Sequence, residues 1–114
     1  MAEDEEDAID IAAEILSFLP DHTLAEPDKV PNSDKWDRKC KGLGKTVPSD
    51  PNRPYDMRSV IEEVVDEERF LELFPGYAEN IVIGFARLDG QSVGVVANQP
   101  KVLAGCLDID ASVK

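Results

Sequence analysis

The stretch NIVIGFARLDGQSVGVVANQP, residues 80–100, constrains the fold more than any other part of the chain. Residues 81–88 and 92–98 are apolar and rich in β-branched side chains, and Asp89 and Gly90 between them favour a tight type I′ turn. These features predict an antiparallel β-hairpin. Because both runs are nearly continuous rather than alternating, both faces of the hairpin should be covered. The chain offers one helix for this purpose, and we expect the other face to lack cover from this sequence.

Two segments have apolar residues at the spacing of an amphipathic helix. The first is predicted over residues 5–19, where carboxylates favour the positive end of the helix dipole and Pro20 ends the helix. The second is predicted over residues 56–68, with Asp56 as N-cap, and is expected to cover one face of the hairpin. The short and partly alternating residues 69–74 then predict a strand that ends at a Pro-Gly turn.

Residues 20–54 hold six of the eight prolines and few large apolar side chains, which is typical of a linker. We expect Trp36 in this segment to pack against a neighbouring element rather than to bind a partner. The sequence KGLGKT at 41–46 resembles the end of a phosphate-binding loop, but Lys39 stands at the required upstream glycine and Pro48 interrupts a following helix. A flexible basic loop is therefore the preferred interpretation.

The formal net charge of −12 limits the partners of this chain. A surface with this excess of carboxylates repels phosphate groups, which argues against nucleic acid and anionic membranes as partners. No apolar run approaches the ~18 residues of a membrane span, and the acidic N-terminal residues resemble neither a secretory signal nor a transit peptide. The sequence contains two cysteines, Cys40 and Cys106, and one histidine, His22. These are too few to form a cluster of metal ligands, so we predict no metal site. We expect both cysteines to be free thiols in a cytoplasmic protein.

The last residues, LDIDASVK, have the pattern of a strand end followed by a helix start, with Asp110 and Ser112 as candidate N-caps. We expect no helix to form there, because the sequence ends two residues after Ser112. Two explanations stay open at this point. The chain is either a complete small domain or a piece of a longer polypeptide.

Five motifs follow one another in residues 51–112, in this order: RPYDMR, PGYAENIV, GFARLDG, VGVVANQP and AGCLDIDAS. Together they resemble an internal stretch of the carboxyltransferase (β) subunit of biotin-dependent acyl-CoA carboxylases, closest to the propionyl-CoA and methylmalonyl-CoA group. EEDAIDIAAEILSFLP resembles the helix that closes the preceding subdomain of the same family. The resemblance implies an α/β fold, namely a partial crotonase-like (ββα) carboxyltransferase domain with an N-terminal helix and a proline-rich linker.

This resemblance divides the chain into two parts and implies a function. Residues 1–47 would be the tail helix of the N-terminal carboxyltransferase subdomain plus its linker, and residues 48–114 the start of the C-terminal subdomain. The full enzyme would transfer a carboxyl group from carboxybiotin to the α-carbon of a short acyl-CoA such as propionyl-CoA. This segment would bind no cofactor directly and would be inactive alone. Biotin carboxylase, the biotin carrier and further copies of the subunit are the implied partners of the full enzyme.

We expect no catalytic side chain in this chain, because the oxyanion-hole glycines of the family have no counterpart in it. Asn98 and Gln99 are candidates for substrate or biotin binding, since they lie at a strand end, where α/β folds often place ligands. The alternative is that they satisfy the backbone of the turn before Pro100. Tyr77 and Arg87 are expected to be structural. A different function also stays open, in which the chain is a small acidic interaction domain without catalysis.

Overall fold

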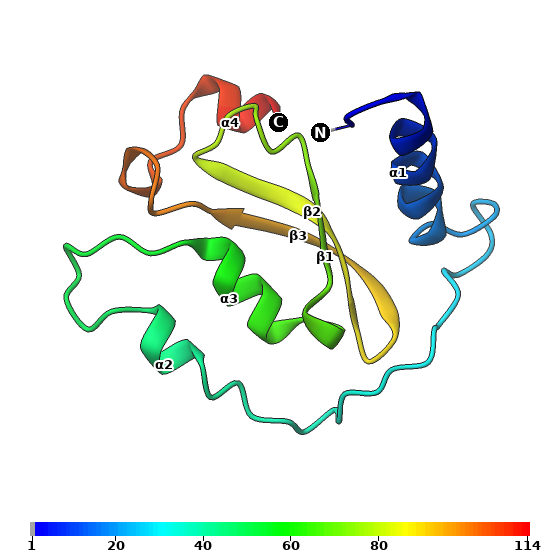
Figure 1. Cartoon of the computed structure of the whole chain (residues 1–114), viewed down its shortest axis with the longest axis horizontal. Helices are drawn as coiled ribbons and strands as arrows, with labels where there is room; N and C mark the ends of the chain where they lie inside the picture. Colours follow the sequence, from blue (N-terminus) through cyan, green and yellow to red (C-terminus); the bar gives the residue numbers. More distant parts are fainter. Residues whose placement is uncertain (1) are drawn as a thin grey trace.

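The structure is a computed structural model that describes residues 2–114, and a three-stranded antiparallel sheet in the order β1-β2-β3 forms its centre. Strand β1 comprises Phe70–Leu73, β2 comprises Ile81–Leu88 and β3 comprises Gln91–Asn98. Helix α3, Met57–Val64, lies along one face of this sheet (Figure 1). The mixture of helices and strands confirms the α/β expectation.

The hairpin of β2 and β3 forms as the sequence predicts, with Asp89 and Gly90 at its turn. Their φ angles of 50° and 78° are both positive, as a type I′ turn requires. Leu88 pairs with Gln91, so β3 begins one residue earlier than predicted. Strand β1 pairs antiparallel with β2, which confirms a strand here, although it is one residue shorter at each end than the predicted 69–74.

Helix α3 is shorter than the predicted helix over residues 56–68. Its N-cap is Asp56, as predicted, but it ends where Val65 takes an extended backbone. A 3₁₀ turn, η1 at Asp66–Glu68, follows. The Asp66 carboxylate accepts hydrogen bonds from the two backbone N–H groups of the hairpin turn at 3.0 and 2.7 Å. The residues that would extend the helix therefore hold the turn instead.

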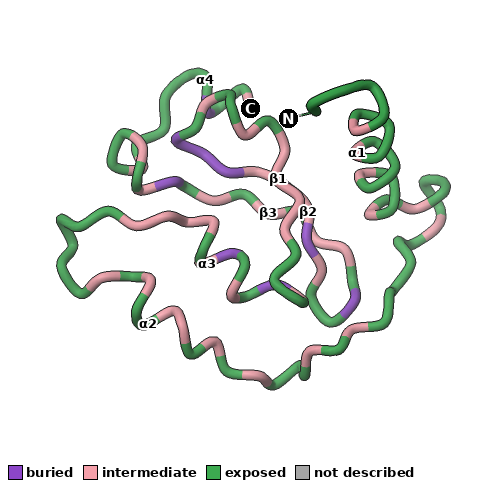
Figure 2. The backbone as a smooth tube through the Cα atoms, viewed as in Figure 1, coloured by how far each residue is buried: buried purple, intermediate pink, exposed green. Residues whose placement is uncertain are grey.

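The hydrophobic core lies between α3 and the sheet. Ile61 and Val65 pack with Val82 and Ala86, and all four side chains are buried (Figure 2). Burial of one aliphatic side chain contributes about 1.5–3 kcal/mol, so this layer holds the helix on the sheet. The partly buried side chains around the core come from both layers: Met57, Phe70, Val93, Val95 and Ala97.

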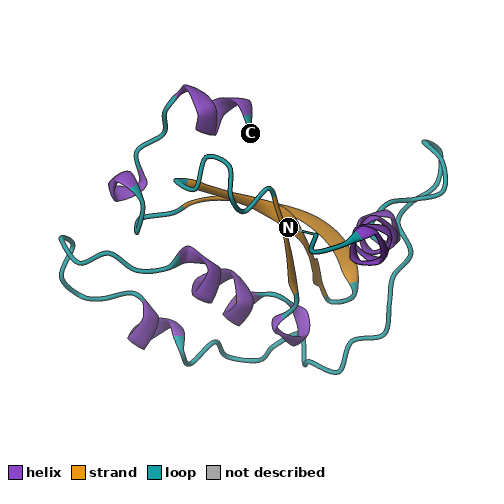
Figure 3. Cartoon of the chain, turned by 45° about the horizontal axis from the view of Figure 1, so that its top comes forward, coloured by secondary structure: helices purple, strands orange, loops and turns teal. Residues whose placement is uncertain are grey.

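The opposite face of the sheet has cover near its two ends. Towards the hairpin turn, the ring of Phe18 stacks on that of Phe85, with centroids 5.5 Å apart. Helix α4, Ile109–Val113, lies at the other end (Figure 3). Its Ala111 is buried. Val96 between these two regions is 73% exposed. The expectation that this face lacks cover is therefore wrong at the ends and holds for the middle.

Helix α1, Glu5–Ser17, confirms the predicted N-terminal helix and ends two residues earlier than expected. The Asp4 carboxylate caps it by accepting a hydrogen bond from the Asp7 N–H at 2.8 Å. None of the α1 residues is buried. Phe18 at its C-cap touches the sheet, and the guanidinium of Arg87 lies 4.8 Å from the centre of the Phe18 ring. The C-terminal end of α1 is thus its point of attachment to the sheet.

Residues 28–42 of the linker, which we call the strap, are bonded to the hairpin turn and to the end of α3. The Val30 N–H donates to the Gly90 carbonyl at 3.1 Å. The guanidinium of Arg38 donates to three consecutive backbone carbonyls, those of residues 63–65, at 2.8, 3.2 and 2.8 Å. Because the last carbonyls of a helix lack partners within it, Arg38 acts as the C-terminal cap of α3.

Two predictions within the linker are wrong. Trp36, expected to pack against another element, is 86% exposed. Residues 41–46, expected to be a flexible loop, contain the one-turn helix α2, Leu43–Thr46. The Gly42 N–H donates to the Glu63 carboxylate at 3.0 Å, which ties this turn to α3.

The C-terminal residues also differ from expectation, because a helix does form. Helix α4 begins after Asp108, whose carboxylate accepts a hydrogen bond from the Ala111 N–H at 2.9 Å. The N-cap is therefore Asp108, and the predicted caps Asp110 and Ser112 lie inside the helix. Asp108 has the extended backbone that an N-cap needs, and this places the helix start two residues earlier.

Candidate functional site

Both candidate binding residues lie at the end of β3, but their surroundings differ. Gln99 is fully buried, and its side-chain amide is bonded through both of its polar atoms. Its Oε1 accepts from the Met57 N–H at 3.0 Å, and its Nε2 donates to Asp56 Oδ1 at 2.7 Å. Gln99 therefore provides α3 with an N-terminal hydrogen bond that the helix cannot make by itself.

Asp56 also belongs to a polar network with Arg58 and Glu72. Its Oδ1 accepts from the Arg58 N–H at 2.9 Å, and the Arg58 guanidinium binds both oxygens of Glu72 at 2.6 and 2.7 Å. Burial raises the pKa of Asp56, but the hydrogen bonds from Gln99 and Arg58 outweigh it, so the pKa lies below its ordinary value. The hydrogen bond to Glu72 raises the pKa of Arg58. These groups stay charged and fixed, which suits positioning rather than proton transfer.

Asn98 is exposed and faces the loop of residues 99–108, which leads from β3 to α4. Its Nδ2 donates to the Gly105 carbonyl at 3.0 Å, which leaves Oδ1 available as an acceptor. Leu103 and Ala104 in this loop have φ angles of 49° and 53°, a region that residues other than glycine rarely adopt. An exposed amide oxygen beside a rigidly held loop is suited to accept a hydrogen bond from a ligand N–H.

Asn80 is a residue of this region that the sequence interpretation missed. It is 2% exposed, and its Nδ2 donates to the Cys106 carbonyl at 2.8 Å. The backbone carbonyl of Asn80 accepts a hydrogen bond from the Gln99 N–H at 3.0 Å. The signal available in the sequence was a polar side chain directly before the apolar run of β2. Tyr77 lies nearby, with its hydroxyl 3.5 Å from Asp110 Oδ1.

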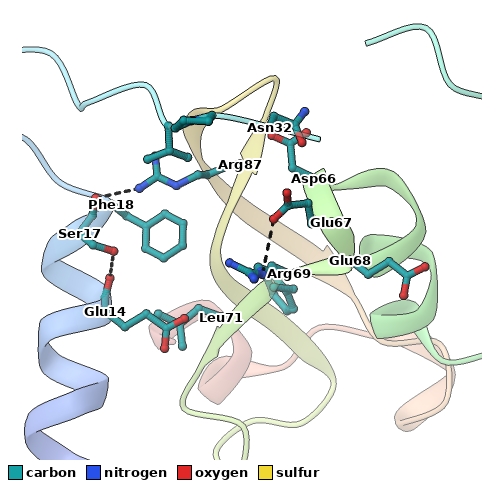
Figure 4. Close-up of a pocket in the computed structure, with 13 residues that line it drawn as sticks. Glu14, Ser17, Phe18, Asn32, Asp66, Glu67, Glu68, Arg69, Leu71 and Arg87 are labelled. Atoms are coloured by element: carbon teal, nitrogen blue, oxygen red, sulfur yellow. Dashed lines mark hydrogen bonds and ion pairs between the residues drawn. The ribbon is translucent and has the colours of Figure 1, made fainter. Parts of the chain in front are cut away.

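A cavity of about 720 Å³ lies at the other end of the sheet, near the hairpin turn. In Figure 4, Arg87 lies beside Phe18 and donates to the Ser17 carbonyl at 2.9 Å, while Glu67 and Arg69 form an ion pair at 3.7 Å. Arg87 also bonds the backbone and Ser92 around the turn, which confirms its structural role. The cavity walls come from α1, the strap, η1 and β1, so this space is separate from Asn98 and Gln99.

An apolar groove of about 450 Å³ lies on the sheet face opposite α3. Strand residues such as Ile83 and Val96 form its floor, and Leu107 and Ala111 form one wall. Lys114 at its rim donates to the carbonyls of Ala78 and Ile81 at 3.4 and 2.8 Å. The lining of the groove is mainly apolar, with Ser112 and Lys114 as its polar side chains, so the groove offers contact area rather than chemistry.

The described residues do not bring together side chains for nucleophilic or metal chemistry. His22 is exposed, and its Nδ1 accepts from the Leu24 N–H at 3.2 Å. Cys40 and Cys106 are free thiols. Over residues 2–114, no group of three or more potential metal ligands occurs, and no helix has the length and apolar character needed to cross a membrane.

Comparison with known proteins places this geometry in a family. The family model described as "Carboxyl transferase domain" matches residues 1–114. The chain is 47% identical over 113 residues to methylmalonyl-CoA decarboxylase subunit alpha of Veillonella parvula, covering 99% of this chain and 22% of the relative. It is 48% identical over 122 residues to the propionyl-CoA carboxylase beta chain of Saccharopolyspora erythraea, covering 100% and 22%.

A solved structure agrees with these relatives. Transcarboxylase 12S, crystallised as a hexamer with methylmalonyl-CoA and methylmalonic acid bound, matches with a TM-score of 0.90 and 45% identity. The match covers 97% of this chain and 21% of that one, so the chain spans about a fifth of the length of these proteins. Its fold is part of a crotonase-like α/β carboxyltransferase domain. Because the family model matches the whole sequence, the chain belongs to the carboxyl transferase domain family.

Proposed function

We propose that this chain is part of a carboxyltransferase that moves a carboxyl group from carboxybiotin to the α-carbon of a short acyl-CoA such as propionyl-CoA. The observation that carries the proposal is the identity of 47%, 48% and 44% to three relatives over nearly the whole chain. Their names are methylmalonyl-CoA decarboxylase subunit alpha, propionyl-CoA carboxylase beta chain and biotin-dependent acetyl-/propionyl-coenzyme A carboxylase beta5 subunit. The shared element of these names is a short acyl-CoA that gains or loses a carboxyl group.

The proposed reaction needs stabilisation of charge more than acid–base side chains. The carboxyl carbon leaves a ureido nitrogen of carboxybiotin and bonds to the α-carbon of the thioester, and the proton of the α-carbon ends on the biotin nitrogen. Negative charge develops on the thioester oxygen and on the ureido oxygen. Backbone N–H donors aimed at such charge contribute about 3–4 kcal/mol each, so we assign no catalytic side chain to this chain.

We further propose the division of the chain that the resemblance implies. Residues 1–47, of which residue 1 lies outside the described part, would be the tail helix of the N-terminal subdomain and its linker. Residues 48–114 would be the start of the C-terminal subdomain. In support, α3 and the sheet share one hydrophobic core, whereas α1 has no buried residue.

Asn98 and Gln99 stay our candidates for the ligand site, with different roles. Asn98 is exposed and has an acceptor oxygen available, so we propose that it contacts the substrate or biotin. Gln99 is fully buried and bonded to α3, so we propose that it supports Asn98 by fixing the end of β3. The ligand contact itself is a prediction from the position of the two residues.

The proposed partners follow from the same reaction. Biotin would arrive on a carrier subunit after carboxylation by a biotin carboxylase, and the full protein would associate with further copies of itself. Support comes from the term beta chain in the names of relatives and from the hexamer assembly of transcarboxylase 12S. The proposed compartment is the cytoplasm, where Cys40 and Cys106 would stay reduced thiols.

The full-length protein tests this function directly. Methylmalonyl-CoA labelled in its free carboxyl group is incubated with the protein and a biotinylated carrier domain. The labelled carboxybiotin and the unlabelled propionyl-CoA that form are then quantified. We expect both products in equal amounts, and neither when the carrier lacks biotin. Long-chain acyl-CoA thioesters that carry a carboxyl group on the α-carbon serve as the comparison donors. Loss of the carboxyl group without biotin, or no transfer with any short acyl-CoA, would contradict the proposed function.

A further inference from the structure

The loop of residues 99–108 holds an unfavourable backbone conformation next to the proposed ligand site. Leu103, Ala104 and Gly105 follow one another with positive φ angles of 49°, 53° and 77°. A residue with a side chain is unfavourable in this region, and such conformations persist only where the surrounding structure holds them. Some other group must therefore fix this loop.

Asn80 is a buried residue that helps to fix it, since its backbone and its side chain bond the loop on both sides of the strained residues. Its backbone carbonyl accepts a hydrogen bond from the Gln99 N–H at 3.0 Å, before the turn. Its Nδ2 donates to the Cys106 carbonyl at 2.8 Å and to Asp108 Oδ1 at 3.3 Å after the turn. Asn80 is 2% exposed, so these bonds are shielded from competing water. Its side chain has the carboxamide donor that both acceptors need.

We propose that Asn80 is a positioning residue of the ligand site, which holds loop 99–108 so that Asn98 Oδ1 faces the ligand. The Asn98 Nδ2 is already bonded to the Gly105 carbonyl within this loop, so the position of the Asn98 amide depends on the loop. The available oxygen accepts a hydrogen bond from an amide-type N–H, which the ureido ring of biotin and the pantetheine arm of coenzyme A both carry. The identity of the ligand rests on the proposed function, whereas the shape of the loop does not.

Three variants separate this role from a general effect on folding. Asn80→Asp keeps the shape of the side chain but turns a carboxylate towards the Cys106 carbonyl and the Asp108 carboxylate. Asn80→Asp combined with Asp108→Asn restores one donor and one acceptor between the two positions. Asn52→Asp adds the same charge at an exposed residue whose sequence neighbours lie outside the loop and whose backbone N–H bonds Asp50; it is the matched control.

Hydrogen exchange of the Gly105 and Cys106 amides in the full-length protein reports the shape of the loop. These amides donate to the carbonyls of Val102 and Leu103, at 3.0 Å each. In Asn80→Asp we expect them to exchange about tenfold faster or more, since the loop loses a buried hydrogen bond that holds its shape. The α3 amides should stay protected. The double variant should recover part of the protection, and unchanged exchange in Asn80→Asp would overturn the positioning role.

Kinetics of the same variants report the ligand. We expect Asn80→Asp to raise the KM for either the acyl-CoA or the biotin substrate about tenfold while kcat changes by less than about twofold. The substrate whose KM rises is the one that Asn98 contacts. Faster exchange with both KM values unchanged would overturn the role of the loop at the ligand site, but not the role of Asn80 in holding the loop. An unaltered protein that transfers no carboxyl group would overturn the proposed function, and the exchange result would still decide the role of Asn80 in the loop.

Discussion

Substitution of Gln99 by glutamate gives the most informative test of the buried polar network. Gln99 is fully buried, and its Nε2 donates to Asp56 Oδ1 at 2.7 Å. In Gln99→Glu a carboxylate replaces this donor and faces the Asp56 carboxylate. The hydrogen bond from the Met57 N–H to the side-chain oxygen can persist, so the change isolates the contact between residues 56 and 99.

The magnitude is set by protonation rather than by the full repulsion. Two carboxylates about 3 Å apart repel by roughly 5 kcal/mol at an effective dielectric constant of about 20. Protonating one of them costs about 1.4 kcal/mol per pH unit above an ordinary pKa of about 4.3, which is about 4 kcal/mol at pH 7 and about 1 kcal/mol at pH 5. Because protonation costs less than the repulsion at both pH values, the cost of protonation sets the loss of stability. We expect Gln99→Glu to lose about 4 kcal/mol at pH 7 and about 1 kcal/mol at pH 5.

The sign of this pH dependence follows from linkage. The carboxyl pair has a raised pKa in the folded variant, so the folded state binds more protons and its stability falls as the pH rises above the ordinary pKa. Urea unfolding followed by far-ultraviolet circular dichroism, relative to the unaltered chain at each pH, measures it. Gln91→Glu adds the same charge at the exposed first residue of β3 and should be nearly neutral. Equal losses in Gln99→Glu at pH 5 and pH 7 would refute the reasoning.

Three further predictions concern the other contacts. Arg38→Ala leaves three backbone carbonyls at the end of α3 without a donor, which should lower the free energy of unfolding by about 2–3 kcal/mol and speed proteolysis of the strap. Arg38→Lys should not restore this stability, since an ammonium group lacks the planar fork of a guanidinium. Phe18→Ala removes the stacking on Phe85 and should raise the protease sensitivity of α1 while α3 stays protected. Hydrogen bonds from the Ala111 N–H and the Asn80 amide lower the pKa of Asp108. The stability that the Asp108 carboxylate provides should therefore be lost as the pH falls through that lowered pKa. Asp108→Asn should weaken this acid sensitivity of α4, which an NMR titration measures.

The sheet and its core could be predicted from the sequence because their signals are local. Asp89 and Gly90 fix the turn, and the turn fixes which residues of β2 and β3 pair. The spacing of apolar residues after Asp56 predicts the face of α3 that meets the sheet. The end of α3 could not be predicted, because it depends on Asp66 binding a turn more than twenty residues later.

Contacts between distant polar residues explain the other differences. The strap looks like an unstructured linker in the sequence, yet Arg38 reaches the end of α3, and no local pattern specifies that target. Gln99 was a candidate for ligand binding because of its place at a strand end, and its burial against Asp56 appears only after folding. Asn98 was chosen by the same rule and remains exposed, so the position of a residue along a strand does not decide its exposure.

The polar contacts also explain why separate sequence motifs occur together. Four of the five motifs contribute a polar side chain to the hydrogen bonds at one end of the sheet, and all of these side chains are buried or half-buried except the exposed Asp108. The fifth motif contains the hairpin turn at the other end. Because a buried donor or acceptor without its partner costs about 1–3 kcal/mol, a change in one of these motifs leaves a group in another motif unsatisfied. The motifs are therefore constrained as a set, and double substitutions among them should deviate from additivity. The residues that make these contacts are Asp56 and Arg58 from RPYDMR, Asn80 from PGYAENIV, Gln99 from VGVVANQP, and Asp108 from AGCLDIDAS.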